Sequence, residues 1–171
     1  MTREILRTYL EIKSILDLKE SIILSNNSKV KLVNLKDFQL NKFFYKHIGK
    51  KYYWTDRLQW SDQKWIDYVL SKSIFTYILK YNDELVGYFE IIFHEEKQES
   101  EIAYLGILEE YFEKKLGGYL LGEAIKKSFL LNIKRAWVHT SSLDHKNALK
   151  NYLSRGMTIF KSETILSNVS S

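Results

Sequence analysis

Apolar residues recur along this chain with two different periods, and each period predicts one kind of element. Alternation of apolar and polar residues predicts strands, whereas apolar residues three and four positions apart predict amphipathic helices. The alternating stretches are residues 5–12, 30–35, 74–81, 84–93, 101–108, 135–141 and 157–166. The helical stretches are residues 38–48, 62–70, 116–131 and 145–155. This order of elements predicts an α+β fold.

Polar residues and glycines mark the ends of the helices. Asp37 and Ser61 are suited to cap the first two helices, and Asp144 is suited to cap the last. Gly49 and Gly156 predict left-handed helix ends. The sequence SNNSK at residues 25–29 predicts a turn between the first two strands.

The strands in the middle of the chain predict the core of the sheet. Residues 74–81, 84–93 and 101–108 follow one another closely, which favours an antiparallel meander. A long helix then separates residues 101–108 from residues 135–141. A strand, a helix and a further strand form a crossover connection, so these last two strands are predicted to run parallel.

The short connection HEEKQES after residue 93 allows a prediction of strand register. If Glu95 and Glu96 form a two-residue turn, Glu90 lies directly opposite Glu101. Two adjacent carboxylates raise one of the two pKa values, which suits a general base. The alternative is that both glutamates are ordinary solvent-facing strand residues.

Composition limits the classes of protein that the chain can represent. Its 171 residues are 45% hydrophobic and lack a linker rich in Pro, Gly or Ser, which predicts one globular domain. With no cysteine, disulfides, a thiolate nucleophile and cysteine-ligated zinc are excluded, and we expect no metal site. A charged N-terminal segment and the absence of long apolar runs predict a cytoplasmic protein without membrane contact.

The net charge of +5 admits an anionic partner. The lysines are scattered over the chain rather than clustered, so we do not expect nucleic-acid binding. Residues 101–127 are the best candidate for an anion site: a strand runs into the polar sequence EEYFEKK, and a helix begins near Gly117 and Gly118. Free N–H groups at such a helix start bind phosphates, and Lys114 and Lys115 lie close by. The alternative is that the two glycines only permit close helix packing.

A second candidate segment lies between the first two helices. Trp54 and Trp60 bracket Asp56 and Arg57, which combines aromatic surface with one anion and one cation. This composition suits the wall of a binding site. It equally suits a packed loop with an internal Asp–Arg pair, and the spacing favours neither interpretation.

Three features together give the chain a resemblance to a known family: the order of elements, the loop bearing LGG, and NALKNYLSRGMTIF near the end. With the segments TDRLQW (residues 55–60) and VHTSSLDHKNAL (residues 138–149), they resemble the GNAT superfamily of acyl-CoA-dependent N-acetyltransferases. The resemblance implies a single domain over residues 1–171, with residues 1–29 as an N-terminal extension that has room for an extra strand. It implies a mixed, mostly antiparallel sheet with helices on both faces and a splayed fourth and fifth strand.

The resemblance also implies acetyl-CoA as cofactor. The family's pyrophosphate loop, Gln/Arg-x-x-Gly-x-Gly/Ala, falls on Phe112, Glu113, Lys114, Lys115, Leu116 and Gly117, with Gly118 following. Phe112 and Lys115 depart from the pattern, so backbone binding of phosphates requires Lys115 to adopt a positive φ. Pantetheine is expected beside Leu105 and Ile107, with a bulge at Gly106, and near Asn147.

For the chemistry, the resemblance implies Glu101 as general base and Tyr152 as general acid, with Glu90 attracting the amine. Tyr152 alternatively is a core aromatic residue. If Trp54, Asp56, Arg57 and Trp60 line the acceptor site, Asp56 binds an ammonium group and Arg57 a carboxylate. The predicted function is acetyl transfer from acetyl-CoA to a primary amine of a small molecule or peptide, by direct attack in a ternary complex. The alternative is a non-catalytic GNAT-like module that binds CoA or another ligand.

One departure concerns the end of the chain. GNAT domains usually close with two C-terminal strands, whereas only one strand is predicted after residue 156. Either the strand at residues 5–12 or a second chain could take the missing place, so both a monomer and a homodimer are compatible with the sequence.

Overall fold

The computed structural model describes residues 2–21 and 29–168, and the turn predicted at residues 25–29 lies outside these ranges except for Lys29. The strands are β1 (Thr2–Ile12), β2 (Val30–Asn34), β3 (Ile74–Tyr81), β4 (Glu84–His94), β5 (Glu99–Ile107), β6 (Arg135–Ser141) and β7 (Thr158–Asn168). The helices are α1 (Phe38–Gly49), α2 (Asp62–Leu70), α3 (Leu116–Phe129) and α4 (Ala148–Ser154). None of the described helices has the length and apolar character needed to cross a membrane.

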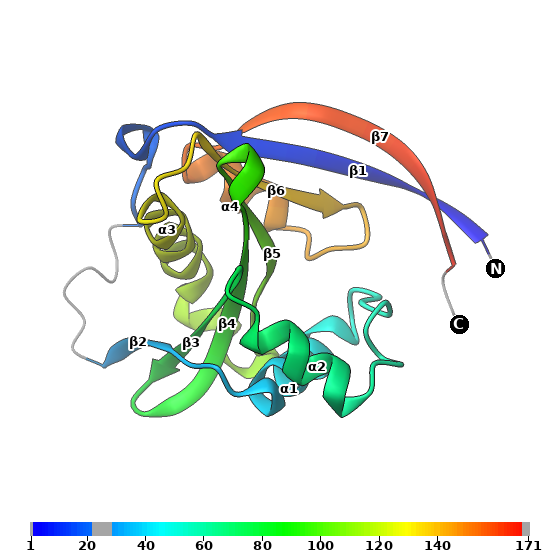
Figure 1. Cartoon of the computed structure of the whole chain (residues 1–171). Coiled ribbons are helices and arrows are strands. Elements are labelled where there is room, and N and C mark those ends of the chain that lie inside the picture. Colours follow the sequence, from blue (N-terminus) through cyan, green and yellow to red (C-terminus); the bar gives the residue numbers. More distant parts are fainter. Residues whose placement is uncertain (1, 22–28, 169–171) are drawn as a thin grey trace.

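The strands form one sheet in the order β2-β3-β4-β5-β6-β1-β7, with helices on both faces, as predicted (Figure 1). Consecutive residues of a strand point to opposite faces, and β3 shows which helices cover each face. Ile78 packs in a cluster with Phe44 and Ile48 of α1. The next residue, Leu79, belongs to a larger cluster that contains Leu120 of α3.

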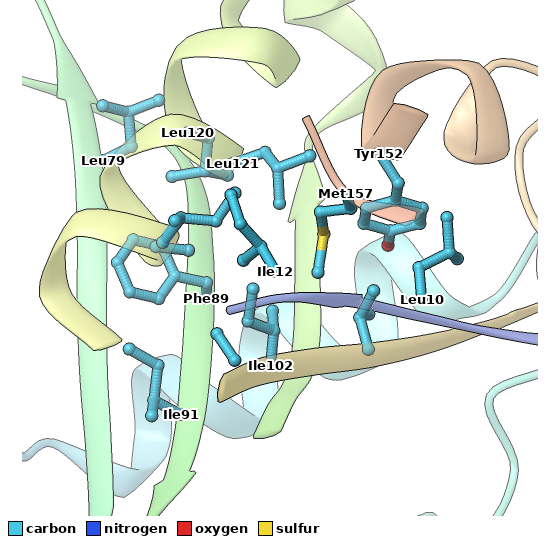
Figure 2. Close-up of a cluster of buried hydrophobic side chains, with 14 of the residues drawn as sticks. Leu10, Ile12, Leu79, Phe89, Ile91, Ile102, Leu120, Leu121, Tyr152 and Met157 are labelled. Carbon is cyan, nitrogen blue, oxygen red and sulfur yellow. The ribbon is translucent and has the colours of Figure 1, made fainter. Parts of the chain in front are cut away.

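Figure 2 shows this larger cluster, which forms the main hydrophobic core between the sheet and α3. Phe89 and Leu120 are fully buried in it. The N-terminal strand contributes Leu10, with 0% exposure, and Ile12, with 2%. β1 is therefore part of the main core, and the hydrophobic effect holds it in the sheet.

β1 occupies the place of the second C-terminal strand that the sequence lacks. β1 pairs with β6 over Arg7–Ile12 and with β7 over Thr2–Glu11, antiparallel in both cases. The strand predicted at residues 5–12 thus lies between β6 and β7, and the chain itself fills the place. Because β1 pairs with β7 further than with β6, the two continue as a ribbon that carries both chain ends away from α3 (Figure 1).

β5 and β6 form the parallel pair of the sheet, as the crossover predicts, and they separate after a short distance. Their pairing ends at Glu101 opposite Trp137, after three residue pairs. β5 continues alongside β4 as far as Ile107, and β6 continues alongside β1 as far as Ser141. The facing edges of β5 and β6 are left unpaired beyond Glu101, which confirms the predicted splay.

The predicted register between β4 and β5 is wrong. Ile92, and not Glu90, lies opposite Glu101, while Glu90 lies opposite Tyr104. The connection is not a two-residue turn, because Glu95–Lys97 forms a 3₁₀ helix that ends at Gln98 in the left-handed conformation. The register also shifts between Glu90 and Ile91, where Ala103 of β5 has no partner.

The bulge predicted at Gly106 is therefore located at Ala103. Gly106 pairs regularly with Tyr88, and its lack of a side chain has another cause. A Cβ atom at Gly106 would lie 2.7 Å from Cγ2 of Ile48, so glycine allows α1 to pack directly on β5.

The predicted caps of α1 and α2 are confirmed: Asp37 accepts a hydrogen bond from the Gln39 N–H, and Ser61 accepts one from the Lys64 N–H. Gly49 is not a left-handed cap, since α1 ends in a right-handed Lys50. A Cβ at Gly49 would lie 2.5 Å from Cβ of Trp54, so the close return of the chain requires the glycine.

The last helix also begins later than predicted. α4 starts at Ala148 and not next to Asp144, whose carboxylate accepts hydrogen bonds from the Thr140 hydroxyl at 2.6 Å and the Ser141 N–H at 2.9 Å. Asp144 therefore closes the turn after β6. Gly156 ends the helix segment with a φ of 100°, as predicted.

Candidate active site

A cleft of about 1340 Å³ opens where β5 and β6 diverge. Its walls come from the unpaired part of β5, the α1–α2 connection, the start of α3, the segment from β6 to α4, and the β1/β7 ribbon. The cleft therefore depends on segments from both ends of the chain and from its middle.

Most of the residues predicted from the sequence line this one cleft. The candidate catalytic residues in its lining are Glu101 and Tyr152. The candidate cofactor residues are Leu105, Ile107, Phe112, Lys115, Leu116, Gly117, Gly118 and Asn147. The candidate substrate residues are Trp54, Asp56 and Arg57. The predicted residues that do not line it are Glu90, Trp60, Glu113 and Lys114.

The diverging ends of β5 and β6 form a fork. Glu101 lies at its closed end, because the pair of Glu101 and Trp137 is the last between the two strands. Burial raises the pKa of its carboxyl group, while the nearby charges of His94 and Arg57 act in the opposite direction. His94 Nε2 is 3.5 Å from the Glu101 carboxylate. A carboxylate with a raised pKa beside a cleft is suited to accept a proton.

The loop before α3 has the backbone geometry that an anion site needs. Residues Glu109–Lys114 form a 3₁₀ helix, and Lys115 then adopts φ 56° and ψ 32°. This left-handed residue takes the conformation that the glycine of the family pattern would adopt readily. α3 begins immediately afterwards at Leu116, and Gly117 and Gly118 form its first turn, where the N–H groups have no partners within the helix.

Side chains from α4 and its C-terminal end meet this first turn. Asn151 donates a hydrogen bond to the Gly117 carbonyl at 3.1 Å. Nη1 of Arg155 would lie 3.1 Å from a Cβ atom at Gly118, so the glycine lets the guanidinium approach the helix. Nη1 and Nε of Arg155 are shielded from solvent and have no hydrogen-bond partner among the described residues. Arg155 thus adds a positive charge to this end of the cleft.

Tyr152 belongs to both the core and the cleft. Its ring is 8% exposed and packs near Leu10 and Met157, where Figure 2 shows it at the edge of the cluster. Burial raises the pKa of its hydroxyl group, with a further contribution from the charge of Asp144. Tyr152 therefore stays protonated at neutral pH, and it is part of the cleft lining.

Glu90 and Arg57 have partners different from those that the sequence suggested. Arg57 donates to Glu90 at 2.8 Å, and no ion pair joins it to Asp56 within the described ranges. Tyr68 and Asn41 also donate to the Glu90 carboxylate, at 2.7 and 2.9 Å. The Glu90 side chain has 0% exposure, so its observed role is to hold Arg57 and not to contact a ligand.

The aromatic residues of the α1–α2 segment divide into two groups. The guanidinium of Arg57 lies 4.7 Å from the ring centroid of Trp60 and 4.3 Å from that of Tyr104, which places Trp60 in the packing around Arg57. Trp54 and Asp56 instead line the cleft. The segment is thus packed around Arg57, but without the predicted Asp56–Arg57 pair. A role of Trp54 and Asp56 in binding stays a prediction.

Several residues near the site were not found from the sequence, among them Asn151 and Arg155 beside α3, and His94 and Arg7. His94 follows Glu90 and Ile92 on the same face of β4, so the correct register would have placed it beside Glu101. Arg7 lines the cleft from β1. No local sequence signal points to Arg7, because its position depends on the insertion of β1 between β6 and β7.

The forked sheet and its cleft define an acetyltransferase-like α+β fold. The chain belongs to the acetyltransferase (GNAT) family, whose family model matches residues 38–157. The comparison with curated proteins found no match.

Solved structures share the fold at low sequence identity. A functionally unknown conserved protein from Staphylococcus epidermidis is 16% identical, with a TM-score of 0.61 over 96% of this chain and 62% of its own. A GCN5-related N-acetyltransferase from Kribbella flavida is 14% identical, with a TM-score of 0.67 over 99% and 61%. The aminoglycoside acetyltransferase meta-AAC0020 from an uncultured soil metagenomic sample is 12% identical, with a TM-score of 0.63 over 75% and 88%. The present chain thus spans less than two thirds of the first two proteins.

Proposed function

We propose that this protein transfers the acetyl group of acetyl-CoA to a primary amine of a small molecule or peptide, by direct attack in a ternary complex. The observation that best supports the proposal is the position of Glu101 at the closed end of the fork between β5 and β6. A candidate base with a raised pKa there adjoins a cleft bordered by two free strand edges.

The distribution of charge in the cleft supports two different ligands. Positive charge comes from Lys115, the residue before α3, from Lys150 on α4, and from Arg155, the residue after α4. Asp56 and Glu101 contribute negative charge from the α1–α2 connection and β5. The basic part suits the phosphates of a nucleotide cofactor, and the acidic part suits a cationic amine.

The residues present fit acetyl-CoA, which would supply an activated thioester when bound in the cleft. The free edge of β5 from residue 103 to 107 offers backbone groups to an amide-containing chain. The first turn of α3 offers N–H groups to phosphates, and the backbone of Lys115 already has the conformation that exposes them. Arg155 adds unpaired donors next to Gly118.

The proposed roles are assigned to Glu101 and Tyr152, the two candidate catalytic residues in the cleft lining. Glu101 accepts a proton from the acceptor ammonium group and so makes the amine nucleophilic. The Tyr152 hydroxyl donates a proton to the leaving sulfur. The likeness of fold to an aminoglycoside acetyltransferase, an enzyme that acts on an amine-bearing small molecule, is compatible with this acceptor class.

Calorimetry with acetyl-CoA, followed by product analysis with amino acids, polyamines and peptides, tests the proposal. We expect cofactor binding and acetylation of at least one amine, with a large loss of turnover in Glu101→Gln. No binding at millimolar acetyl-CoA would overturn the proposal. Binding of CoA without acetylation across the panel would instead identify a non-catalytic module, the alternative favoured by the non-glycine residue Lys115.

A further inference from the structure

Arg7, on β1, is part of the lining of the cleft. Its cross-strand partner on β6 is Ser141, and the cleft lining includes both residues together with Ile5 and His139. Arg57, the other arginine on this side, has its charge matched by Glu90 and is 6% exposed. The cation available to a ligand here is therefore Arg7.

The side chain of Arg7 has no hydrogen bond and no ion pair to any residue within the ranges 2–21 and 29–168. Its Nε is shielded from solvent and lacks a partner. Glu163, the cross-strand partner of Arg7 on β7, accepts a hydrogen bond from Tyr9 at 2.6 Å and pairs with Lys161 at 3.3 Å. Asp144 closes the turn after β6.

The charge of Arg7 acts on His139, another residue of the cleft lining. The pKa of His139 is lowered, first by desolvation of its ring and then by the charge of Arg7. Glu163 lies opposite Arg7 on β7 and its charge interacts with that of Arg7, but no hydrogen bond or ion pair joins the two side chains. A ligand carboxylate can therefore still bind the Arg7 guanidinium with two parallel hydrogen bonds.

The strand register gives the spacing between Arg7 and the candidate base. Trp137, the partner of Glu101, and Ser141, the partner of Arg7, are four residues apart on β6. Four residues of strand span about 13 Å along β6, and Glu101 and Arg7 lie on strands on opposite sides of β6, which adds about 10 Å across the sheet. The long arginine side chain shortens the gap that a ligand must bridge. A single α-amino acid is too short to place its amine at Glu101 and its carboxylate at Arg7.

We propose that Arg7 binds an acidic group of the acceptor, so that the preferred ligand carries a carboxylate several bonds from its reacting amine. This inference names the substrate class of the acetyltransferase site and rests on that proposed function for the identity of the reacting amine. A peptide with a free C-terminus and an ω-amino acid both have this chemistry.

The test compares 6-aminohexanoate with 6-aminohexanamide, which differ in charge at one end and share one amine. In the wild type we expect kcat/KM to be about tenfold to a hundredfold higher for the acid, since a charged hydrogen-bonded pair has about this effect. Arg7→Gln should abolish the preference by lowering kcat/KM for the acid much more than for the amide. Arg7→Lys should keep part of it, and Arg3→Gln, an exposed control on the same strand, should behave as the wild type. Equal use of both compounds by the wild type would overturn the inference, as would an equal loss for both in Arg7→Gln.

Binding separates this inference from the proposed function. Calorimetry of the same two compounds, with CoA present, requires no turnover. Tighter binding of the acid by the wild type but not by Arg7→Gln would support Arg7 even if no amine were acetylated. Failure to bind either compound, or equal binding of both by the wild type, would overturn the role of Arg7 whether or not other amines react.

Discussion

The guanidinium of Arg57 donates a hydrogen bond to the Glu90 carboxylate at 2.8 Å, and both side chains are almost completely withdrawn from solvent. Arg57 lies in the connection between α1 and α2, whereas Glu90 lies on β4 in the middle of the sheet. The pair therefore fixes the segment that presents Trp54 and Asp56 to the cleft.

Removal of Glu90 should strongly destabilise the protein. Glu90→Ala leaves the buried Arg57 charge without its partner, and breaking a buried pair in this way costs about 3–5 kcal/mol in the free energy of unfolding. Urea unfolding monitored by tryptophan fluorescence measures the change. The control is Lys31→Gln, which breaks the exposed Lys31–Asp83 pair and should cost less than about 1 kcal/mol. Similar small effects for both variants would contradict the structural role of Glu90.

The raised pKa of Glu101 makes its contribution to stability depend on pH. Because the pKa is higher in the folded protein than the ordinary value of 4.5, the contribution is complete below that value and is lost as pH rises through the folded-state pKa. Glu101→Gln should therefore unfold at the same temperature as the wild type at low pH and at a higher temperature at neutral pH. Thermal unfolding across this range measures the difference, and a difference that does not change with pH would exclude a raised pKa.

Tyr152→Phe should separate catalysis from packing. The substitution keeps the ring that packs near Leu10 and Met157 and removes only the hydroxyl group. As a general acid is lost, kcat should fall by about 10²-fold or more, with the Kd for acetyl-CoA nearly unchanged. Tyr77→Phe, on β3 outside the cleft lining, is the matched control and should keep wild-type turnover. An unchanged kcat in Tyr152→Phe would leave Tyr152 with a packing role only.

Two glycines with different surroundings test the packing of the sheet against the helices. A Cβ at Gly106 would lie 2.7 Å from Ile48, so Gly106→Ala should destabilise the protein by about 1–3 kcal/mol through overpacking. Combining Gly106→Ala with Ile48→Ala removes Cγ2 and Cδ1 of Ile48, the two atoms closest to the added Cβ, and should restore part of the loss. At Gly122, within α3, an added Cβ meets no atom within 4 Å, so Gly122→Ala should stabilise by about 0.5–1 kcal/mol. Chemical denaturation of all three variants measures these differences, and equal effects at the two glycines would refute the packing argument.

Local patterns in the sequence predicted the elements well, because alternation and helical spacing reflect which side of an element is buried. They failed at the β4–β5 register, since Gln98 in a left-handed conformation and the unpaired Ala103 change the pairing without altering the alternation of either strand. They also wrongly predicted a left-handed helix end at Gly49 and a bulge at Gly106. Both positions require glycine because Trp54 and Ile48 approach them closely, and not because of local backbone geometry.

The sequence by itself determined the order of elements, the loop before α3 and the family to which the chain belongs, because these depend on neighbouring residues and on motif spacing. Only the tertiary structure decided that Arg57 pairs with Glu90, that β1 enters the sheet between β6 and β7, and that Arg7 faces the cleft. Each of these contacts joins residues far apart in the chain, and its partner is selected by burial of apolar surface and compensation of charge across the whole fold.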